Sequence, residues 1–438
     1  MGLNSKTVNV VTLGCSKNIV DSEQVMRQLT GSGFSVVHNS DDLSRSNIVL
    51  INTCGFIGDA KEESIEMILK FAEAKSKGKV EKIFVFGCLS QRYREELSAE
   101  MPEVDGFFGV NDLKTVIKVL GAEYKQQLLN ERELTTPSHY AYLKISEGCS
   151  WGCSYCAIPL IRGKHISRPI EDLVTEASLL AKKGVKELIV IAQDSTYYGK
   201  DMYGERRIGE LLIKLSTIEG IEWIRLHYAF PYQFPEVLID VIANNPKICA
   251  YLDIPFQHVS NRVLDKMRRK VSASETYDLI DKLRKGIPNL ALRTTLLVGH
   301  PGEEIDDFNE LLRFVEKVRF DRLGVFPYSE EEGTHGAISF PDSIPFEEKV
   351  RRVGEVMRLQ QQIAEDLNSQ KVGKTFRVII DQEEVDYYIG RTEHDSPEVD
   401  GEVMVKKGNL PLTVGEFYNI KITDSLDYDL IGEVLSLS

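Results

Sequence analysis

The stretch EGCSWGCSYCAIPLIRG, residues 147–163, places three of the seven cysteines of this 438-residue chain within eight positions. They are Cys149, Cys153 and Cys156, in the spacing C-x3-C-x2-C. By chance this spacing would arise in roughly one such chain in five hundred, so we interpret the cysteines as metal ligands. Closed zinc and ferredoxin sites take four protein ligands, yet no further Cys or His follows before His165. Three thiolates predict a four-iron cluster with one open iron; the alternative is a zinc site completed by a distant residue.

The quoted stretch follows the first of six apolar, strand-like runs that alternate with helix-length segments. Six such units predict a partial (β/α)6 barrel, whose functional face lies at the carboxyl ends of its strands. We place this domain at residues 131–370 and expect a long charged helix over residues 346–369 to close it. The six runs are YLKIS (142–146), ELIVIA (187–192), WIRLHYA (223–229), AYLDIPF (250–256), LALRTTLLVG (290–299) and RLGVFPYS (322–329).

Upstream, residues 1–130 show the same alternation, which predicts an open parallel α/β sheet. Cys15, Cys54 and Cys88 each stand one or two residues beyond one of its strand-like runs VNVVTL, NIVLINT and KIFVF. Because parallel strands end at one edge of a sheet, we expect the three cysteines to converge beside helix N-termini, which favour thiolates. The spacing alone also allows three buried structural cysteines. The polar stretch at residues 130–140 is predicted to be a linker.

Downstream of Gly373 the apolar pattern changes to a period of two, in five short runs joined by tight turns. This predicts a small five-stranded antiparallel β-barrel over residues 371–438. The same residues hold 7 Lys+Arg and 14 Asp+Glu, a net charge of −7, which is half of the −14 of the whole chain. Such an acidic domain repels phosphate backbones and suits a basic protein partner; the alternative is a merely solvated acidic surface.

The bulk composition is that of an ordinary globular protein, with 42% hydrophobic and 27% charged residues. The sequence contains no apolar run long enough to span a membrane, and its N-terminus lacks the basic and apolar segments of an export signal. We therefore expect a cytoplasmic location and no membrane partner. Thiols stay reduced there, so clustered cysteines are expected to bind metals or catalyse rather than form disulfides.

Two motifs resemble known families. The spacing C-x3-C-x2-C, with Tyr155 before its last cysteine, is similar to the radical S-adenosylmethionine superfamily. TLGCSKNIVDSE, INTCGFI and FGC resemble the N-terminal domain of radical methylthiotransferases, which hold a second four-iron cluster on three cysteines at matching places. The resemblance implies two [4Fe-4S] clusters facing one cavity, with S-adenosylmethionine bound to the open iron of the barrel cluster and cleaved there to a 5′-deoxyadenosyl radical.

The sequences of four stretches further resemble one branch of the methylthiotransferases, and the C-terminal domain resembles a TRAM domain. The branch transfers a methylthio group to the β-carbon of an aspartate in small-subunit ribosomal protein S-twelve, either free or within the ribosome. This implies a basic protein substrate, an electron donor, and nucleic acid only as part of the ribosome. The alternatives are a tRNA adenosine methylthiotransferase and a non-catalytic iron–sulfur electron carrier. The stretches are TLGCSKNIVDSE, YLKISEGC, YLDIPFQH and GRTEHDSPEVDGEV.

Several further residues are candidate contacts for S-adenosylmethionine, by their place in the barrel and by the resemblance. Arg162 is another candidate polar contact, or else half of a surface ion pair, and Cys249 is expected to be a buried apolar residue. We assign no catalytic residue beyond the clusters. The predicted cofactor contacts are Tyr155, Gln193 and Asp194 after the second strand, Gln257 after the fourth, and Gly299 beside His300 after the fifth.

Overall fold

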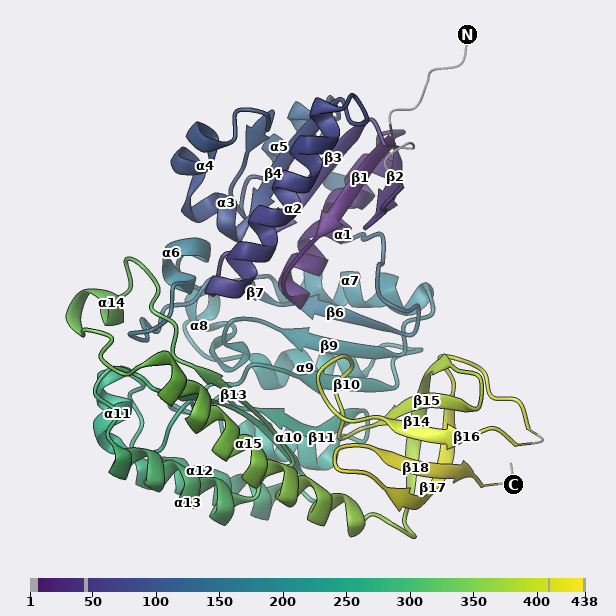
Figure 1. Ribbon diagram of the computed structural model, residues 1–438. Helices are drawn as coiled ribbons and strands as arrows, with labels where there is room; N and C mark the ends of the chain where they lie inside the picture. Colours follow the sequence, from purple (N-terminus) through teal and green to yellow (C-terminus); the bar gives the residue numbers. More distant parts are fainter. Residues whose placement is uncertain (1–6, 43–45, 409, 436–438) are drawn as a thin grey trace.

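The computed structural model describes residues 7–42, 46–408 and 410–435, which form three bodies along the chain (Figure 1). A domain with an open sheet lies above a larger α/β domain, and a small β-barrel lies at one side of the larger domain. This architecture confirms the predicted fold class. Within the described residues, the structure contains no helix that is both long and apolar enough to cross a membrane.

The amino-terminal domain is a five-stranded parallel sheet with helices on both faces. Its elements are β1 (Thr7–Thr12), α1 (Ser16–Gly31), β2 (Ser35–His38), β3 (Ile48–Thr53), α2 (Gly58–Ser76), β4 (Lys82–Gly87), α3 (Cys88–Arg92), α4 (Arg94–Glu100), β5 (Gly106–Phe107), α5 (Leu113–Val119) and the 3-10 turn η2 (Gln126–Leu128). The strand order is β2-β1-β3-β4-β5. The central strand β3 is buried along its whole length, as expected for a parallel sheet covered on both faces. The sequence pattern identified β1, β3 and β4 but not the edge strands β2 and β5, which are short.

The central domain is a half-open barrel of six parallel strands. Its elements are β6 (Tyr140–Lys144), β7 (Ser146–Glu147), α6 (Ile158–Arg162), β8 (Ile166–Ser167), α7 (Ile170–Lys182), β9 (Glu187–Ile191), η3 (Ser195–Tyr197), α8 (Lys200–Tyr203), α9 (Ile208–Ser216), β10 (Trp223–Leu226), α10 (Val237–Asn244), β11 (Ile248–Asp253), α11 (Asn261–Lys266), α12 (Ala273–Gly286), β12 (Ala291–Val298), α13 (Ile305–Val318), β13 (Arg322–Pro327), α14 (His335–Ser339) and α15 (Phe346–Ser369). The strand order is β13-β12-β11-β10-β9-β6, so β6 and β13 are the two edges. Each of the six predicted runs forms one of these strands.

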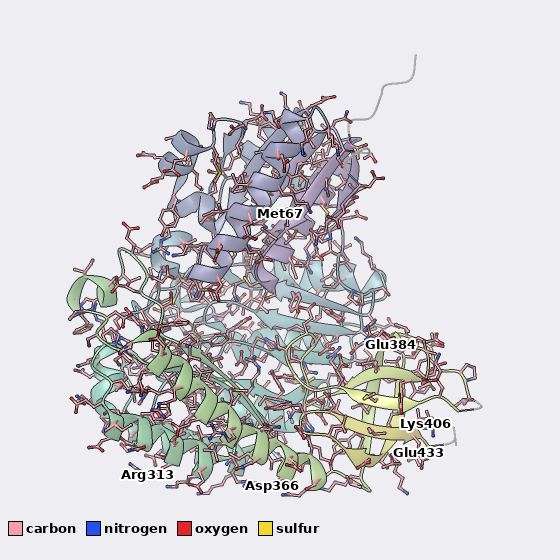
Figure 2. All side chains as sticks on the ribbon, viewed as in Figure 1. Met67, Arg313, Asp366, Glu384, Lys406 and Glu433 are labelled. Atoms are coloured by element: carbon pink, nitrogen blue, oxygen red, sulfur yellow. The ribbon has the colours of Figure 1, made fainter. Side chains whose placement is uncertain are left out.

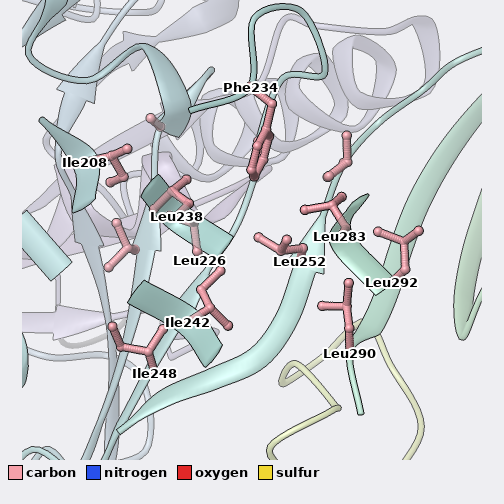
Figure 3. Close-up of a cluster of buried hydrophobic side chains, with 14 of the residues drawn as sticks. Ile208, Leu226, Phe234, Leu238, Ile242, Ile248, Leu252, Leu283, Leu290 and Leu292 are labelled. Atoms are coloured by element: carbon pink, nitrogen blue, oxygen red, sulfur yellow. The ribbon is translucent and has the colours of Figure 1, made fainter. Parts of the chain in front are cut away.

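The largest hydrophobic core lies between these strands and their outer helices (Figure 3). Leu226, Leu252 and Leu292, from three neighbouring strands, are at most 1% exposed. Leu238 of α10 and Leu283 of α12 are fully buried in the same cluster. Each leucine stabilises the fold by about 1.5–3 kcal/mol relative to an exposed side chain. This core fixes the barrel strands and thereby the loops at their carboxyl ends.

The carboxyl-terminal domain is a closed five-stranded barrel, as predicted. Its strands are β14 (Thr375–Glu383), β15 (Tyr387–Thr392), β16 (Val403–Lys406), β17 (Phe417–Ser425) and β18 (Leu430–Val434). They close in the order β14-β15-β16-β18-β17. The prediction of a wholly antiparallel barrel was wrong in one detail, because β16 and β18 pair in parallel and only the other four pairs are antiparallel. The parallel pair arises because β17 lies between them in sequence and pairs with the far side of β18.

The loop between β15 and β16 enters the concave side of the half-barrel. Ser396 forms a hydrogen bond to His227, with 2.9 Å between Oγ and Nε2. The hydroxyl of Tyr251 donates to Asp400 at 2.8 Å, and that of Tyr142 donates to Glu398 at 3.1 Å. The third domain therefore fills part of the barrel lumen and anchors itself there through buried polar contacts.

The first domain closes the open side of the half-barrel along β6. Val20 of α1 packs with Tyr140 and Ile189 on the inner face of the sheet. The stretch predicted as a linker is anchored rather than free, because the fully buried Arg132 side chain forms ion pairs with Glu23 of α1 and Glu176 of α7. This buried pairing holds the two domains in a fixed relation.

Candidate active site

A cavity of about 410 Å³ lies at the junction of the first domain and the barrel. Its wall on one side is formed by the residues that follow β1, β3 and β4, and on the other by loops at the carboxyl ends of the barrel strands. The structure thus places the two sets of three cysteines, here called the amino-terminal triplet and the barrel triplet, on one cavity. The cysteines in the lining are Cys15, Cys54 and Cys88 of the first triplet and Cys149, Cys153 and Cys156 of the second.

The amino-terminal triplet is assembled by three strand ends. Cys15 precedes α1, Cys54 directly follows β3, and Cys88 opens α3 after the last residue of β4. The turns carrying the first two approach closely at Gly14, where an added Cβ would lie 2.8 Å from the Cβ of Cys54. Gly14 also has a φ of +92°, which a side chain would strain. This glycine therefore allows the two cysteines to share one wall of the cavity.

The barrel triplet is held by one loop between β7 and α6. The backbone N–H of Cys149 donates to the carbonyl of Gly163 at 3.0 Å, and that of Cys156 donates to Cys153 at 3.1 Å. The N–H of Ser154 donates to the carbonyl of Met267 at 3.0 Å, which ties the loop to the segment after α11. These backbone bonds fix the three thiols independently of the first domain.

Burial disfavours the charged form of several of these thiols. It raises the pKa of Cys88 and that of Cys149 to about 12, and it also raises the pKa of Cys54 and of Cys156. Thiols of this kind become thiolates when a metal replaces the proton. Among the described residues, no three His, Cys, Asp or Glu side chains are spaced to hold a single metal ion. The ligands of an iron–sulfur cluster lie farther apart than those of a single metal ion, because each thiolate binds a different iron.

Arg162 links the first domain to the barrel through a buried polar network. Its guanidinium donates to Glu147 at 2.8 Å and to Asn18 of α1 at 2.7 Å, and it also contacts Asp21 at 3.3 Å. Lys144 completes the network with ion pairs to Asp21 and Glu147. The alternative of a surface ion pair at Arg162 was wrong, since this side chain is 1% exposed. The network crosses the boundary between the first domain and the barrel and fixes their relative position.

Arg269 is a site residue that the sequence did not indicate. Its side chain is buried beside the barrel triplet, with 3.7 Å between Nη1 and the sulfur of Cys153. The guanidinium also lies 4.2 Å from the ring centroid of Phe230, an aromatic residue of the cavity lining. This cation can balance thiolate charge at the barrel triplet. Arg269 lies more than a hundred residues from the cysteines in a run of basic residues, so no local signal marked it.

Three of the predicted cofactor contacts line the cavity: Tyr155, Gln193 and Gln257. The side-chain oxygen of Gln193 is buried and has no hydrogen-bond partner among the residues that the structure describes, so it is available to a bound molecule. The backbone of Gln257 is held by bonds to Thr295 and Leu297 of β12, at 2.9 and 2.7 Å. Gln257 also has a φ of +71°, a strained conformation typical of functional sites.

The other two predicted contacts, Asp194 and Gly299, lie outside the lining. The carboxylate of Asp194 accepts a hydrogen bond from the indole of Trp151 at 2.6 Å and caps η3. Trp151 does line the cavity, so Asp194 orients one of its walls. At Gly299 an added Cβ would lie 2.4 Å from Cγ of Lys349, so this glycine allows α15 to approach. Contact of either residue with a cofactor stays a prediction.

Comparisons with known proteins agree with this division of the chain. Residues 143–315 match the model of the Radical SAM superfamily, and residues 372–435 match the TRAM domain. Residues 7–109 match a family described only as uncharacterized protein family UPF0004. The structure of the radical S-adenosylmethionine methyltransferase TsrM from Kitasatospora setae has a TM-score of 0.55 at 13% identity, over 76% of this chain and 77% of that one. At this identity, the likeness shows the fold alone.

Relatives of known name cover the whole chain. The protein of Phocaeicola vulgatus named ribosomal protein uS12 methylthiotransferase RimO is 54% identical over 99% of this chain and 100% of its own length. Proteins of the same name from Cytophaga hutchinsonii and Flavobacterium johnsoniae are 53% and 52% identical, over 99% and 98% of both chains. These matches confirm the family that the cysteine motifs indicated. The chain belongs to the RimO family of radical S-adenosylmethionine methylthiotransferases.

Proposed function

We propose that this chain adds a methylthio group to the β-carbon of an aspartate in ribosomal protein uS12. The observation that carries the proposal is the convergence of both cysteine triplets on one cavity. Replacement of a C–H bond by a C–S bond joins a radical step to a sulfur transfer, so both reagents must reach one carbon atom. The names of relatives 52–54% identical over nearly the whole chain support the same activity and substrate.

Membership of the radical S-adenosylmethionine superfamily implies one [4Fe-4S] cluster and S-adenosylmethionine as cofactors. We propose that the barrel triplet holds this cluster and that the amino-terminal triplet holds a second one. The donor set fits, because each triplet offers three thiols and leaves one corner of a cubane for a reagent. When bound, these groups supply the radical that removes hydrogen from the β-carbon and the methylthio sulfur that takes its place. Radical formation consumes an electron, so an external electron donor is a further partner.

Side chains of the cavity wall are suited to hold S-adenosylmethionine and exclude water. The rings of Trp151 and Phe230 stack with 4.7 Å between their centroids and form an apolar wall beside the barrel triplet. The amides of Gln193 and Gln257 offer hydrogen bonds to polar groups of the cofactor. Exclusion of water protects a reactive carbon radical until sulfur reaches it.

The electrostatics of the chain favour a protein substrate over tRNA. The outer surface of the carboxyl-terminal barrel carries acidic side chains, such as Glu384 and Glu433, which project into solvent (Figure 2). With a net charge of −7 over residues 371–438, this domain repels phosphates and attracts a basic protein. An electron carrier needs no reagent cavity next to its clusters, so that alternative is not supported.

Mass spectrometry of cells with and without the gene tests the proposal. We expect uS12 from cells that lack the gene to lose the mass of one methylthio group, while methylthiolated adenosine in tRNA stays unchanged. Reconstituted protein should restore the modification of uS12 in an anaerobic reaction with S-adenosylmethionine, a sulfide source and a reductant. Loss of the methylthio group from tRNA alone would show that the substrate is an RNA.

A further inference from the structure

The side chain of Lys17 reaches the cavity from the first turn of α1, two residues after Cys15. It is 6% exposed and forms part of the cavity lining. Its ammonium lies 3.5 Å from the ring centroid of Tyr228, which follows β10 in the barrel. Lys17 therefore presents a positive charge at the boundary between the two domains, on the wall that carries the amino-terminal triplet.

Lys17 differs from the other two cations of the lining in its partners. Arg162 is paired with Glu147 and Asp21, and Arg269 contacts the thiol of Cys153. Within the described part of the chain, no carboxylate lies within ion-pair distance of Lys17, and the lining of the cavity includes no aspartate or glutamate. A buried ammonium whose contact is an aromatic ring alone keeps its hydrogen-bond donors available for an incoming anion.

The ring beneath the ammonium is held in place by a strained backbone. Tyr228 has a φ of +58°, a left-handed conformation that strains a residue other than glycine. Its N–H donates to Asp253 at 3.3 Å, and its carbonyl accepts from the N–H and hydroxyl of Ser195 at 3.0 and 3.2 Å. These contacts aim the ring at Lys17, so that the position of the ammonium is fixed from both domains.

We propose that the ammonium of Lys17 binds the side-chain carboxylate of the target aspartate. This inference rests on the proposed function. In aspartate the carboxylate carbon is bonded directly to the β-carbon. When Lys17 holds the carboxylate in place, it therefore also fixes the position of the β-carbon, whose C–H bond reacts. A lysine beside Cys15 holds that point close to the triplet proposed to deliver sulfur. The adenine of a tRNA substrate is neutral, so it would leave the buried ammonium without an anion. The buried and unpaired charge would weaken binding of the tRNA.

Binding of uS12 tests this pairing directly. The probes are purified uS12 with its native target aspartate and uS12 with asparagine at that position, which keeps the shape and removes the charge. Wild-type protein with both clusters reconstituted should bind the native form at least about 30-fold more tightly than the asparagine form. In Lys17→Met this preference should fall below about 3-fold. The control Lys182→Met removes an exposed lysine of α7 and should keep the wild-type preference.

Two further readouts separate this inference from other roles of Lys17. Lys17→Met should keep the iron content of the wild-type protein and its KM for S-adenosylmethionine, while its KM for native uS12 rises. Equal binding of both uS12 forms by wild-type protein overturns the inference, as does an unchanged preference in Lys17→Met. A raised KM for S-adenosylmethionine with unchanged uS12 binding would assign the ammonium to the carboxylate of the cofactor and also overturns it. The proposed function fails separately, if wild-type protein leaves native uS12 unmodified.

Discussion

The two cysteine triplets reach the same cavity by different routes. The barrel triplet lies on one loop of eight residues. Backbone hydrogen bonds from Cys149 to Gly163 and from Cys156 to Cys153 hold this loop in shape. The amino-terminal triplet comes from three separate strand ends and needs the whole parallel sheet to assemble. One triplet is thus a local motif, while the other is a product of topology and of docking between domains.

The difference teaches which part of the site depends on long-range structure. The barrel triplet keeps its geometry as long as its loop folds and stays bonded to the segment after α11, within the same domain. The amino-terminal triplet faces the same cavity only while α1 stays against β6 and the network around Arg162 is complete. We therefore expect the first half-reaction, cleavage of S-adenosylmethionine, to survive changes that abolish delivery of sulfur.

The largest expected effect comes from removal of one cysteine of either triplet. Cys54→Ala should lower formation of methylthiolated uS12 at least about 1,000-fold and reduce the iron content from about eight to about four per chain, while cleavage of S-adenosylmethionine persists. Cys153→Ala should abolish both product and cleavage. Product and 5′-deoxyadenosine are measured by mass spectrometry, and iron by chemical analysis.

Cys249→Ala is the matched control for this comparison. Cys249 is buried among Trp223, Tyr251 and Ile379, away from the cavity. Its loss should keep both iron content and product within about 3-fold of the wild-type values, since only packing changes. Full methylthiolation by Cys54→Ala would contradict the assignment of a second cluster to the amino-terminal triplet.

The next effect concerns the contact that aligns the triplets. Arg162→Met removes the guanidinium from a buried network and leaves Glu147 and Asn18 without this partner. We expect the free energy of unfolding to fall by about 3 kcal/mol, because the largely buried carboxylates of Glu147 and Asp21 lose one of their two cations and keep only Lys144. Product formation should fall more than cleavage of S-adenosylmethionine, since the domains are no longer held in register. Urea unfolding followed by circular dichroism measures the first effect, and mass spectrometry the second.

Arg27→Met, at an arginine of α1, provides a matched control. Arg27 pairs with Glu131 at 2.6 Å, but the two side chains are 26% and 31% exposed, so the pair contributes at most about 1 kcal/mol. A variant at Arg162 that unfolds at the same urea concentration as this control would show that the buried network does not hold the domains together.

The sequence predicted the parts of the molecule that depend on local pattern. Six apolar runs identified the six barrel strands, and alternation with a period of two identified the small barrel. The convergence of Cys15, Cys54 and Cys88 followed from one topological rule, that parallel strands share an edge. Such rules could not predict contacts between side chains that lie far apart in the sequence. Arg269 and the anchoring of Arg132 depend on tertiary packing, which leaves no periodic signal.

The smallest effect concerns the third domain, which carries neither triplet. A change at its contact with the barrel should therefore alter the stability of the protein without altering the reaction. Glu187 of β9 pairs with Arg225 and with Arg391 of the small barrel, both at 2.8 Å. Burial alone would raise the pKa of Glu187, but the two guanidinium groups outweigh it and hold this pKa below its ordinary value. A lowered carboxyl pKa stabilises the folded state above the unfolded pKa, near 4.3, and this stabilisation is lost as the pH falls through the folded value.

Glu187→Gln removes this dependence and therefore tests it. At pH 7 the variant should be less stable than the wild-type protein. The gap should narrow by about 1–2 kcal/mol as the pH falls from 5 to 3, because in this range the carboxylate takes up its proton more readily in the unfolded wild-type chain than in the folded one. Urea unfolding across this pH range measures the gap, with Glu63→Gln, at an exposed residue of α2, as the control whose gap stays near zero. Near pH 7 the folded variant should cleave S-adenosylmethionine and form product at wild-type ratios, since Glu187 lies outside the cavity lining. A gap that stays constant with pH would show that folding leaves the pKa of Glu187 unchanged, and a changed ratio of product to cleavage would show that the small barrel also aligns the triplets.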